Sequence, residues 1–308
     1  MRTIIYKDFN KLRVQSMSDN NKGTAIFLLI ALSLIWGTSF ILIKQGLKVF
    51  SPEEVGSLRV AAATIFLLPF AFLRWKELKQ GDHIKLFASG MMAIFIPAFL
   101  FALAQTRLQS SVTGILNTLS PLWAMLLGAL LFKQRFRGYA VVGLLISFGG
   151  AIILALARAE GTIGGFNAYA LLVVLACAFY GGNVNFIKFN VQGLSSLTIT
   201  SVSLLLIWPF ALVYLFGFTD FVQKLSTQPG AWEAAGFIVI LALMSTAVAN
   251  LIFNKLLQIS TPLFASSVTY IMPIVSVMWG VLDGEKLYMG HFIGMVALLG
   301  GVYLANRK

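Results

Sequence analysis

Ten long apolar segments alternate with short polar stretches along the chain. They cover residues 23–45, 54–74, 84–106, 111–131, 138–157, 167–188, 196–218, 232–257, 262–282 and 288–305. Each is long enough to cross about 30 Å of hydrocarbon as a helix that rises about 1.5 Å per residue. Strands in lipid require a closed barrel with alternating apolar and polar residues, and these segments do not alternate. The pattern therefore predicts an all-α membrane protein with ten transmembrane helices.

The composition agrees with this prediction. Hydrophobic residues make up 58% of the 308-residue chain and charged residues 11%, whereas a soluble domain carries about 25% charged residues. The apolar run that follows the polar residues 1–22 is too long for the core of a cleavable signal peptide. We expect residues 1–22 to form a cytoplasmic N-terminal tail, and the chain to lie in the lipid bilayer of a bacterial inner (plasma) membrane.

The net charge of +12 comes from basic residues in the loops between apolar segments. A nucleic-acid-binding domain would instead gather them on one face, so we expect no nucleic-acid partner. With the N-terminus in the cytoplasm, the cytoplasmic segments hold 16 Lys and Arg residues and the opposite segments hold six. Cytoplasmic loops are enriched in basic residues. The bias predicts two cytoplasmic termini, and most of it comes from the first half.

The two halves of the chain resemble each other. Trp36-Gly37 followed by Lys44 matches Tyr180-Gly181 followed by Lys188 at the same spacing. Further matches in the same order are Leu68-Pro69-Phe70-Ala71 with Trp208-Pro209-Phe210-Ala211, Pro121 and Gly128 with Pro273 and Gly280, and Gly143, Gly149 and Gly150 with Gly294, Gly300 and Gly301. Five spans per half give the halves opposite orientations. We predict two inverted five-helix repeats, residues 23–157 and 167–306, which is an architecture of secondary transporters.

The chain resembles the EamA-type members of the drug/metabolite transporter superfamily over about residues 24–306. The resemblance is carried by Trp36-Gly37-Thr38-Ser39-Phe40 through Lys44, Arg59, Phe101-Ala102-Leu103 before Thr106, Pro121, and Gly284-Glu285-Lys286-Leu287 before Gly294. It implies a ten-span carrier with two five-helix repeats that works by alternating access. Similar proteins carry amino acids, purines, vitamins, drugs and other metabolites, so the resemblance implies little about the substrate.

One motif departs from this pattern. The glutamate of the family's hinge is present in the second repeat as Glu285, but the matching place in the first repeat holds Gln134, within the basic stretch Lys133-Gln134-Arg135-Phe136-Arg137. A functional role that needs a glutamate at that place is therefore not expected in the first repeat.

Acidic residues and histidines fall in the tail, in loops or at span ends. Proton-coupled carriers commonly place such a group inside the bundle. We therefore favour facilitated or exchange-driven transport over proton coupling through a group near the interface. The chain also lacks grouped metal ligands and paired carboxylates. We expect no enzyme activity, no cofactor and no bound metal.

Polar residues next to the mid-span prolines are candidates for the substrate cavity. Asn117 and Thr118 precede Pro121, and Thr269 and Tyr270 occupy the matching place before Pro273. A proline frees one backbone carbonyl, which can face a cavity. For Thr118 and Thr269 a kink with hydroxyl bonds to the backbone is an equal alternative. For Asn117 and Tyr270 we favour the cavity, since larger polar groups cost more unpaired in lipid.

Other candidates lie on the first, fourth, sixth and eighth spans. Asn183 is nearer the middle of the sixth span than Asn185 and is preferred for the cavity. Asn250 and Asn254 share a helix face and either bind substrate or join neighbouring helices. Trp36, Tyr180 and Trp123, with Phe95, Phe99 and Phe101, either pack against neighbours or stack on substrate. Such a cavity has no net charge and suits a neutral or zwitterionic solute.

Three basic residues lie at or near span ends, and two of them have two interpretations. Lys44 and Lys188 end the matched motifs at opposite faces of the membrane, either as anchors that reach the interface or as charges at the cavity mouth that pair across a gate. Arg59 lies about one turn into the second span, near Glu53 and Glu54. For Arg59 we expect an ion pair at the outer interface.

These observations predict a secondary transporter, with export expected, for small metabolites such as amino acids. The alternatives are a channel or facilitative pore, and a membrane receptor or scaffold that transports nothing. We expect a small-molecule substrate and a monomer or homodimer. The glycines at 143, 149, 150, 294, 300 and 301 permit close helix contact, so the fifth and tenth spans should pack together, within one chain or between two.

Overall fold

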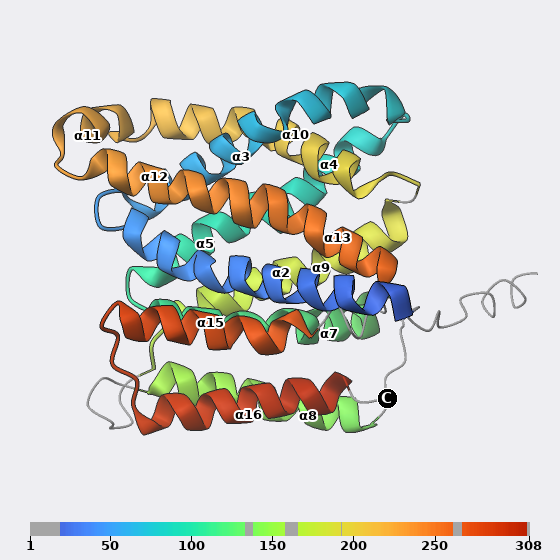
Figure 1. Cartoon of the computed structure of the whole chain (residues 1–308), viewed down its shortest axis with the longest axis vertical. Coiled ribbons are helices and arrows are strands. Elements are labelled where there is room, and N and C mark those ends of the chain that lie inside the picture. The colour runs from blue at the N-terminus through green and yellow to red at the C-terminus, as the bar shows by residue number, and fades with distance from the viewer. Residues whose placement is uncertain (1–18, 133–137, 158–165, 192, 261–266, 307–308) are drawn as a thin grey trace, which may run out of the picture.

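The computed structural model describes residues 19–132, 138–157, 166–191, 193–260 and 267–306. Long helices run side by side in a single bundle (Figure 1). Their bounds are α2 (Asp19–Gly46), α3 (Pro52–Arg74), η1 (Trp75–Glu77), α4 (Asp82–Gly90), η2 (Met91–Phe95), α5 (Ile96–Gln105), α6 (Ser110–Leu116), η3 (Asn117–Leu119), α7 (Ser120–Phe132), α8 (Gly138–Leu156), α9 (Tyr169–Asn190), α10 (Ser196–Gly217), α11 (Phe221–Thr227), α12 (Ala231–Leu241), η4 (Ala242–Val248), α13 (Ala249–Ile259), α15 (Val268–Leu282) and α16 (Met289–Asn306).

These helices form ten spans, which confirms the all-α membrane fold. Eight helical stretches are long and apolar enough to cross a membrane, and the shorter apolar helices α15 and α16 supply the ninth and tenth spans. The third, fourth and eighth spans each join two α-helices through a different helical turn: η2 and η4 are π-helical and η3 is a 3₁₀ turn. The short helix α11, between the seventh and eighth spans, was not predicted. Most of the predicted tail and Gln134 lie outside the described residues.

Local sequence explains where two of the spans begin. Ser51 accepts a hydrogen bond from the Glu54 N–H, and the Glu54 side chain accepts one from the Ser51 N–H. This reciprocal capping box satisfies two of the donors that a helix start leaves unpaired. Pro52 follows at the first helical position, where its missing N–H costs nothing. In the second repeat Ser195 caps α10 in a similar way, by accepting from the Thr198 N–H.

The packing of one half is repeated in the other. The first span, α2, packs on α12, α13 and α15 of the second half, and its counterpart α9 packs on α5 and α7 of the first half. The second and seventh spans, α3 and α10, pack on each other, as do α8 and α16. Each half therefore contributes its first span to the other half, as two inverted repeats around a common axis require.

Glycines bring α8 and α16 into close contact, which confirms that the fifth and tenth spans pack together within the chain. A Cβ built on Gly150 would lie 2.5 Å from the backbone N of Leu298 and 2.7 Å from the carbonyl O of Gly294. On α16, a Cβ built on Gly301 would likewise lie 2.6 Å from the carbonyl O of Gly143. Backbone meets backbone along this interface, as in small-residue contacts of membrane helices.

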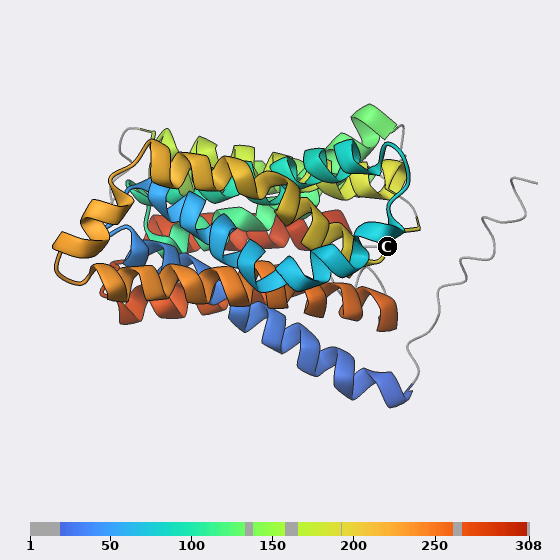
Figure 2. The ribbon, with the colours of Figure 1, turned by 90° about the horizontal axis from the view of Figure 1, so that it is seen from above.

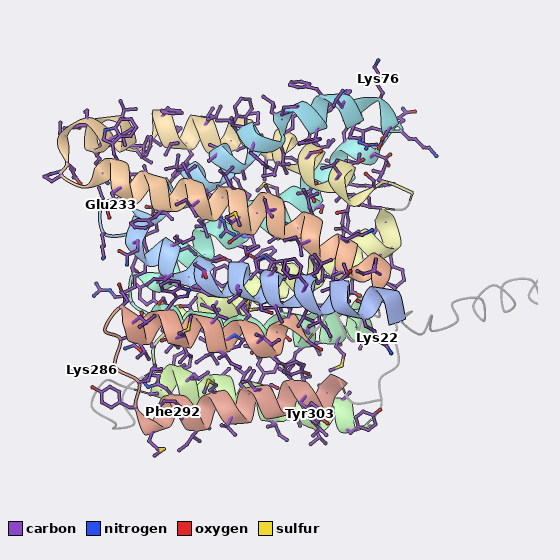
Figure 3. The ribbon with its side chains drawn as sticks, viewed as in Figure 1. Lys22, Lys76, Glu233, Lys286, Phe292 and Tyr303 are labelled. Carbon is purple, nitrogen blue, oxygen red and sulfur yellow. The ribbon has the colours of Figure 1, made fainter. Side chains whose placement is uncertain are left out.

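The described ends of the chain lie on one side of the bundle. Helix α2 begins and α16 ends at the same side (Figure 1). Lys22 and Lys76 lie at that side and Glu233 and Lys286 at the opposite side (Figure 3). The first half of α2 leans out from the other helices (Figure 2). Charge is thus placed at the two ends of the bundle. That the side of the termini is cytoplasmic stays a prediction.

Candidate functional site

An ion pair joins the first span to the loop between the ninth and tenth spans, on the side opposite the described ends. The Nζ of Lys44 lies 2.7 Å from Oε1 of Glu285 and 2.8 Å from Oδ2 of Asp283. The Glu285 carboxylate also accepts hydrogen bonds of 2.5–3.0 Å from the backbone N–H and the hydroxyl of both Ser110 and Ser111. We call these five residues the latch, because they fasten α2, α6 and the loop after α15.

Local geometry explains why Glu285 reaches this place. Gly284 has φ of +81°, a left-handed conformation that glycine adopts without steric cost. The Glu285 N–H then bonds back to the carbonyl O of Gly280, at 2.8 Å. Ser110 and Ser111 begin α6, where backbone N–H groups have no partner within the helix and the helix dipole favours an anion. A carboxylate at this position caps α6 while it pairs with Lys44.

The surroundings of Glu285 keep it ionised. Its side chain is only 3% exposed. Burial by itself would raise the pKa of the Glu285 carboxyl, but the hydrogen bonds from Lys44, Ser111 and Ser110 outweigh burial and hold that pKa below its ordinary value of 4.5. Hydrogen bonds to the charged form stabilise it. The latch is therefore an interaction between charged groups at neutral pH.

This shift predicts the pH range in which the latch is present. Because the pKa of Glu285 is lower in the folded protein, its contribution to stability is complete above the ordinary pKa and is lost only as pH falls through the lowered one. We expect the difference in thermal stability between wild type and Glu285→Gln to stay constant from about pH 8 to about pH 5.5 and to shrink below about pH 4.5. A difference that already shrinks between pH 7 and pH 5.5 would contradict the assignment.

A second group of contacts lies deeper in the bundle. Trp36 is eight residues before Lys44 on α2, about 12 Å from it along the helix. Its Nε1–H donates to the carbonyl O of Ser245, at 3.2 Å, and the hydroxyls of Ser39 and Ser245 are 2.5 Å apart. The next residue, Thr246, accepts from Nε of Arg59 at 3.2 Å. The π-helical turn η4 thus binds both α2 and α3; such turns are frequent at functional sites.

Tyr180 joins the same region from the sixth span. Its ring stacks on the ring of Phe101 at 5.9 Å, and Phe101 meets the edge of Phe40 at the same centroid distance. Tyr180 and Arg59 are close enough to interact electrostatically. We call Trp36, Arg59, Tyr180, Ser245 and Thr246 the central cluster. Its members come from the first, second, sixth and eighth spans, so both repeats contribute to it.

The position of Arg59 corrects the prediction made for it. Arg59 makes no ion pair with a carboxylate of the described residues, and its Nε donates a hydrogen bond to Thr246 in the opposite repeat. The nearby Glu54 instead pairs with Lys224, at 2.7 Å, with its side chain 1% exposed. Glu54 is therefore paired, but with a different cation from the one predicted. Arg59 is too far along the helix to share it and turns inward.

Asn117 and Thr118 lie in the 3₁₀ turn before Pro121 and have different surroundings. Asn117 is partly exposed, and its amide Nδ2 lies 3.7 Å from the Met272 sulfur of the ninth span. Thr118 is fully buried and donates to the carbonyl O of Ile115 in its own helix. The Thr118 contact is the one expected for a kink with a backbone-bonded hydroxyl. The cavity role of Asn117 stays a prediction.

Asn183 and Trp123 each have one buried polar atom without a hydrogen-bond partner among the described residues. Among the described residues no group bonds Oδ1 of Asn183 or Nε1 of Trp123. The Trp123 ring meets the edge of Phe148 at 5.6 Å. Asn185, in contrast, donates to the carbonyl O of Ala124 and of Gly181. Since burying unpaired polar atoms is costly, Asn183 and Trp123 are the better candidates for contact with a polar ligand.

The remaining cavity candidates lie on the eighth and ninth spans. Asn250 donates to the carbonyl O of Thr246, at 2.5 Å, and so continues the contacts of η4. Asn254 belongs to α13, but its side chain lies outside the described part of the structure. Thr269 and Tyr270 lie in the first turn of α15, and both are partly exposed. Their roles in a cavity stay predictions.

Lys188, the counterpart of Lys44, has a different environment. It is exposed at the end of α9, and its Nζ lies 5.4 Å from the centroid of the neighbouring Phe189 ring. No ion pair connects it to an acidic residue within the described ranges. Among the described residues, the ion pair of Lys44 thus has no counterpart at Lys188. The same ranges contain no cluster of metal-ligating residues.

Comparison with known proteins decides the family. The model of the EamA-like transporter family matches residues 23–156 and again residues 167–307. The chain belongs to this family. A crystal structure of similar fold has a TM-score of 0.60 at 18% sequence identity and covers 92% of this chain and 96% of the other. The EamA-like fold is thus supported along nearly the whole chain.

Relatives in this EamA-like family are named as transporters. An uncharacterized transporter of Archaeoglobus fulgidus is 27% identical over 92% of this chain and 99% of its own length. The uncharacterized inner membrane transporter YedA of Escherichia coli K12 is 23% identical over 90% of this chain and 89% of its own length. A "Probable amino-acid metabolite efflux pump" of the same strain is 23% identical over 92% and 95%. The chain is accordingly a multi-pass membrane transporter.

Part of the arrangement in this EamA-like chain has no signal in the sequence. Ser245 and Thr246 lie in a π-helical turn, which leaves no periodic signal in an apolar segment. The sequence places Arg59 inside a span with Glu53 and Glu54 as neighbours, but its hydrogen-bond partner Thr246 belongs to the other repeat. The position of Arg59 within the second span indicates an inward orientation, because ionisable residues within spans commonly face the bundle interior.

Proposed function

We propose that the chain is a secondary transporter that exports small metabolites by alternating access across a bacterial inner membrane, with both termini in the cytoplasm. Amino acids and related compounds are the first candidates. The observation that carries the proposal is the central cluster, which both repeats build beneath a charged latch. Substrate sites of inverted-repeat carriers lie near the midplane where the repeats meet. The amino-acid efflux named for a relative supports the choice of candidates.

The latch gives the proposal a mechanism. With Lys44 bound to Glu285, α2 and α6 are held together at the end opposite the termini. Access to the central cluster from that side requires this ion pair to break. At the other end Lys188 has no acidic partner among the described residues. In our proposal the ion pair therefore restricts access at the latch end, and the end with Lys188 opens more easily. In our proposal substrate enters from the side of the termini and leaves after the latch opens.

The central cluster also bears on energy coupling. Its side chains are aromatic, hydroxyl-bearing or cationic, and no carboxylate of the described residues belongs to it. Proton-coupled carriers commonly use a carboxylate or His inside the bundle. We therefore propose facilitated or exchange-driven transport.

Counterflow in proteoliposomes tests the proposed function. We expect saturable counterflow for one or more members of a panel of radiolabelled amino acids. Trp36→Ala should lower that rate about tenfold. It removes the indole hydrogen bond to Ser245 and the aromatic ring that we propose contacts the substrate. The matched control is Trp232→Ala, since Trp232 is 75% exposed, and its rate should stay within about twofold. Unsaturable conductance would indicate a channel instead, and absence of flux for every solute would indicate a receptor or scaffold.

A further inference from the structure

Arg59 is a cation inside a membrane span, and no acidic residue within the described part of the chain forms an ion pair with it. It lies seven residues after Pro52 on α3, about 10 Å into the helix. Its Nε donates to Thr246, and no other hydrogen bond or ion pair joins it to the described residues. A guanidinium has five N–H donors. Charges in such positions are costly and normally have a partner.

The second repeat does without a cation at this place. When the proline motifs of the two repeats are aligned, Arg59 corresponds to Ile199; when the helix caps Ser51 and Ser195 are aligned, it corresponds to Ser203. Both counterparts are uncharged, although α10 has the same place in the fold as α3. The fold therefore does not require a positive charge here, and a function specific to the first repeat is the better explanation.

We infer that Arg59 binds the carboxylate of the transported solute, and that the solute is a small carboxylate with an apolar or planar body. This inference rests on the proposed transport function and specifies its substrate class. The guanidinium fork matches the geometry of a carboxylate and can bind it with two parallel hydrogen bonds. It replaces the earlier expectation of a binding site without charge.

The groups around Arg59 fit the same class of ligand. Thr246, which accepts from Arg59 at 3.2 Å, and Tyr180, which interacts with the cation electrostatically, each carry a hydroxyl that can donate to a carboxylate. The Tyr180 ring, which stacks on the buried ring of Phe101 at 5.9 Å, supplies an aromatic side chain in the same cluster. No acidic side chain among the described residues pairs with this cluster, so an amino group on the ligand is tolerated but not required. Recognition is expected to depend on the carboxylate.

A set of four related compounds tests this without any variant. Thermal stability of the purified full-length protein is measured with phenylalanine, 3-phenylpropionate, phenylalaninol and phenethylamine. The first two carry the carboxylate and the last two lack it. We expect stabilisation by phenylalanine and 3-phenylpropionate only. Equal stabilisation by phenylalaninol, or no stabilisation by either carboxylate, would overturn the inference.

Variants then locate the carboxylate. Arg59→Gln should weaken binding of 3-phenylpropionate about tenfold or more, and Arg59→Lys should weaken it less. Arg107→Gln, in the exposed loop after α5, is the matched control and should bind as wild type does. If Arg59→Gln does not fold, Thr246→Val and Tyr180→Phe, which each remove one hydroxyl, should weaken binding about threefold. Unchanged binding in these variants would overturn the inference.

The outcomes separate this inference from the proposed function. Carboxylate binding that depends on Arg59, without counterflow, supports the contact between Arg59 and a carboxylate ligand but contradicts transport. Saturable counterflow that is unchanged in Arg59→Gln contradicts the inference and leaves transport standing.

Discussion

Replacing Glu285 with alanine is expected to lower counterflow about tenfold and to destabilise the purified protein by on the order of 3 kcal/mol. The side chain is nearly completely buried and accepts hydrogen bonds from Lys44 and from the backbone and hydroxyl groups of Ser110 and Ser111. Its removal leaves Lys44 with Asp283 as its remaining acidic partner among the described residues, and leaves the start of α6 without its acceptor. Breaking a buried pair by removing one partner costs more than the pair itself contributes.

Three further variants show whether the latch acts as a unit. Lys44→Ala should lower stability and flux less than Glu285→Ala does, because Lys44 is 31% exposed and the Ser110 and Ser111 donors keep their acceptor. Lys48→Ala, in an exposed position four residues later on the same segment, and Lys286→Ala, next to Glu285, are the controls.

Thermal denaturation, counterflow and amide hydrogen exchange of residues 106–116 provide the measurements. Exchange at the start of α6 should become faster in Glu285→Ala and, to a smaller degree, in Lys44→Ala. If Lys44→Ala and Lys48→Ala behave alike in all three, Lys44 is only an interface anchor, and the proposal that the latch gates transport is wrong.

Most of the fold could be predicted from the sequence. Apolar segments of membrane-spanning length leave only one choice of secondary structure, and the paired motifs at Trp36 and Tyr180 indicate the duplication. An odd number of spans per half then inverts the second half. The contact between α8 and α16 followed from glycine spacing, because only small residues let helix backbones approach so closely.

The contacts within the site could not be predicted in the same way. The partners of Lys44 are more than 230 residues away in sequence, and both the gate and the anchor interpretation fit its position. Arg59 has Glu53 and Glu54 as sequence neighbours, but the helix directs it to Thr246 in the other repeat. Which of two nearby groups pairs with a cation depends on the tertiary packing of α3 against η4, and the hydrophobic pattern does not encode it.

Adjacent glycines on the fifth span are expected to differ sharply when each is replaced by leucine. Gly150→Leu should abolish recovery of folded protein, whereas Gly149→Leu should leave stability within about 1 kcal/mol of wild type. A Cβ on Gly150 would lie 2.5 Å from the backbone N of Leu298, and a Cβ on Gly149 has no heavy atom within 4 Å. Gly149 can therefore accept a side chain on the outer face of α8, where leucine also favours the helix.

The same contrast should hold on the tenth span, where Gly301 meets Gly143 and Ser147 but Gly300 meets nothing within 4 Å. Overpacking against a side chain can relax through a rotamer change, but overpacking against backbone forces the helices apart along their length. Monodispersity in size-exclusion chromatography and thermal denaturation after purification measure the outcome. Equal behaviour of Gly149→Leu and Gly150→Leu would mean that the close contact of α8 and α16 is not required for folding, and that the repeats are held together mainly by α3 and α10.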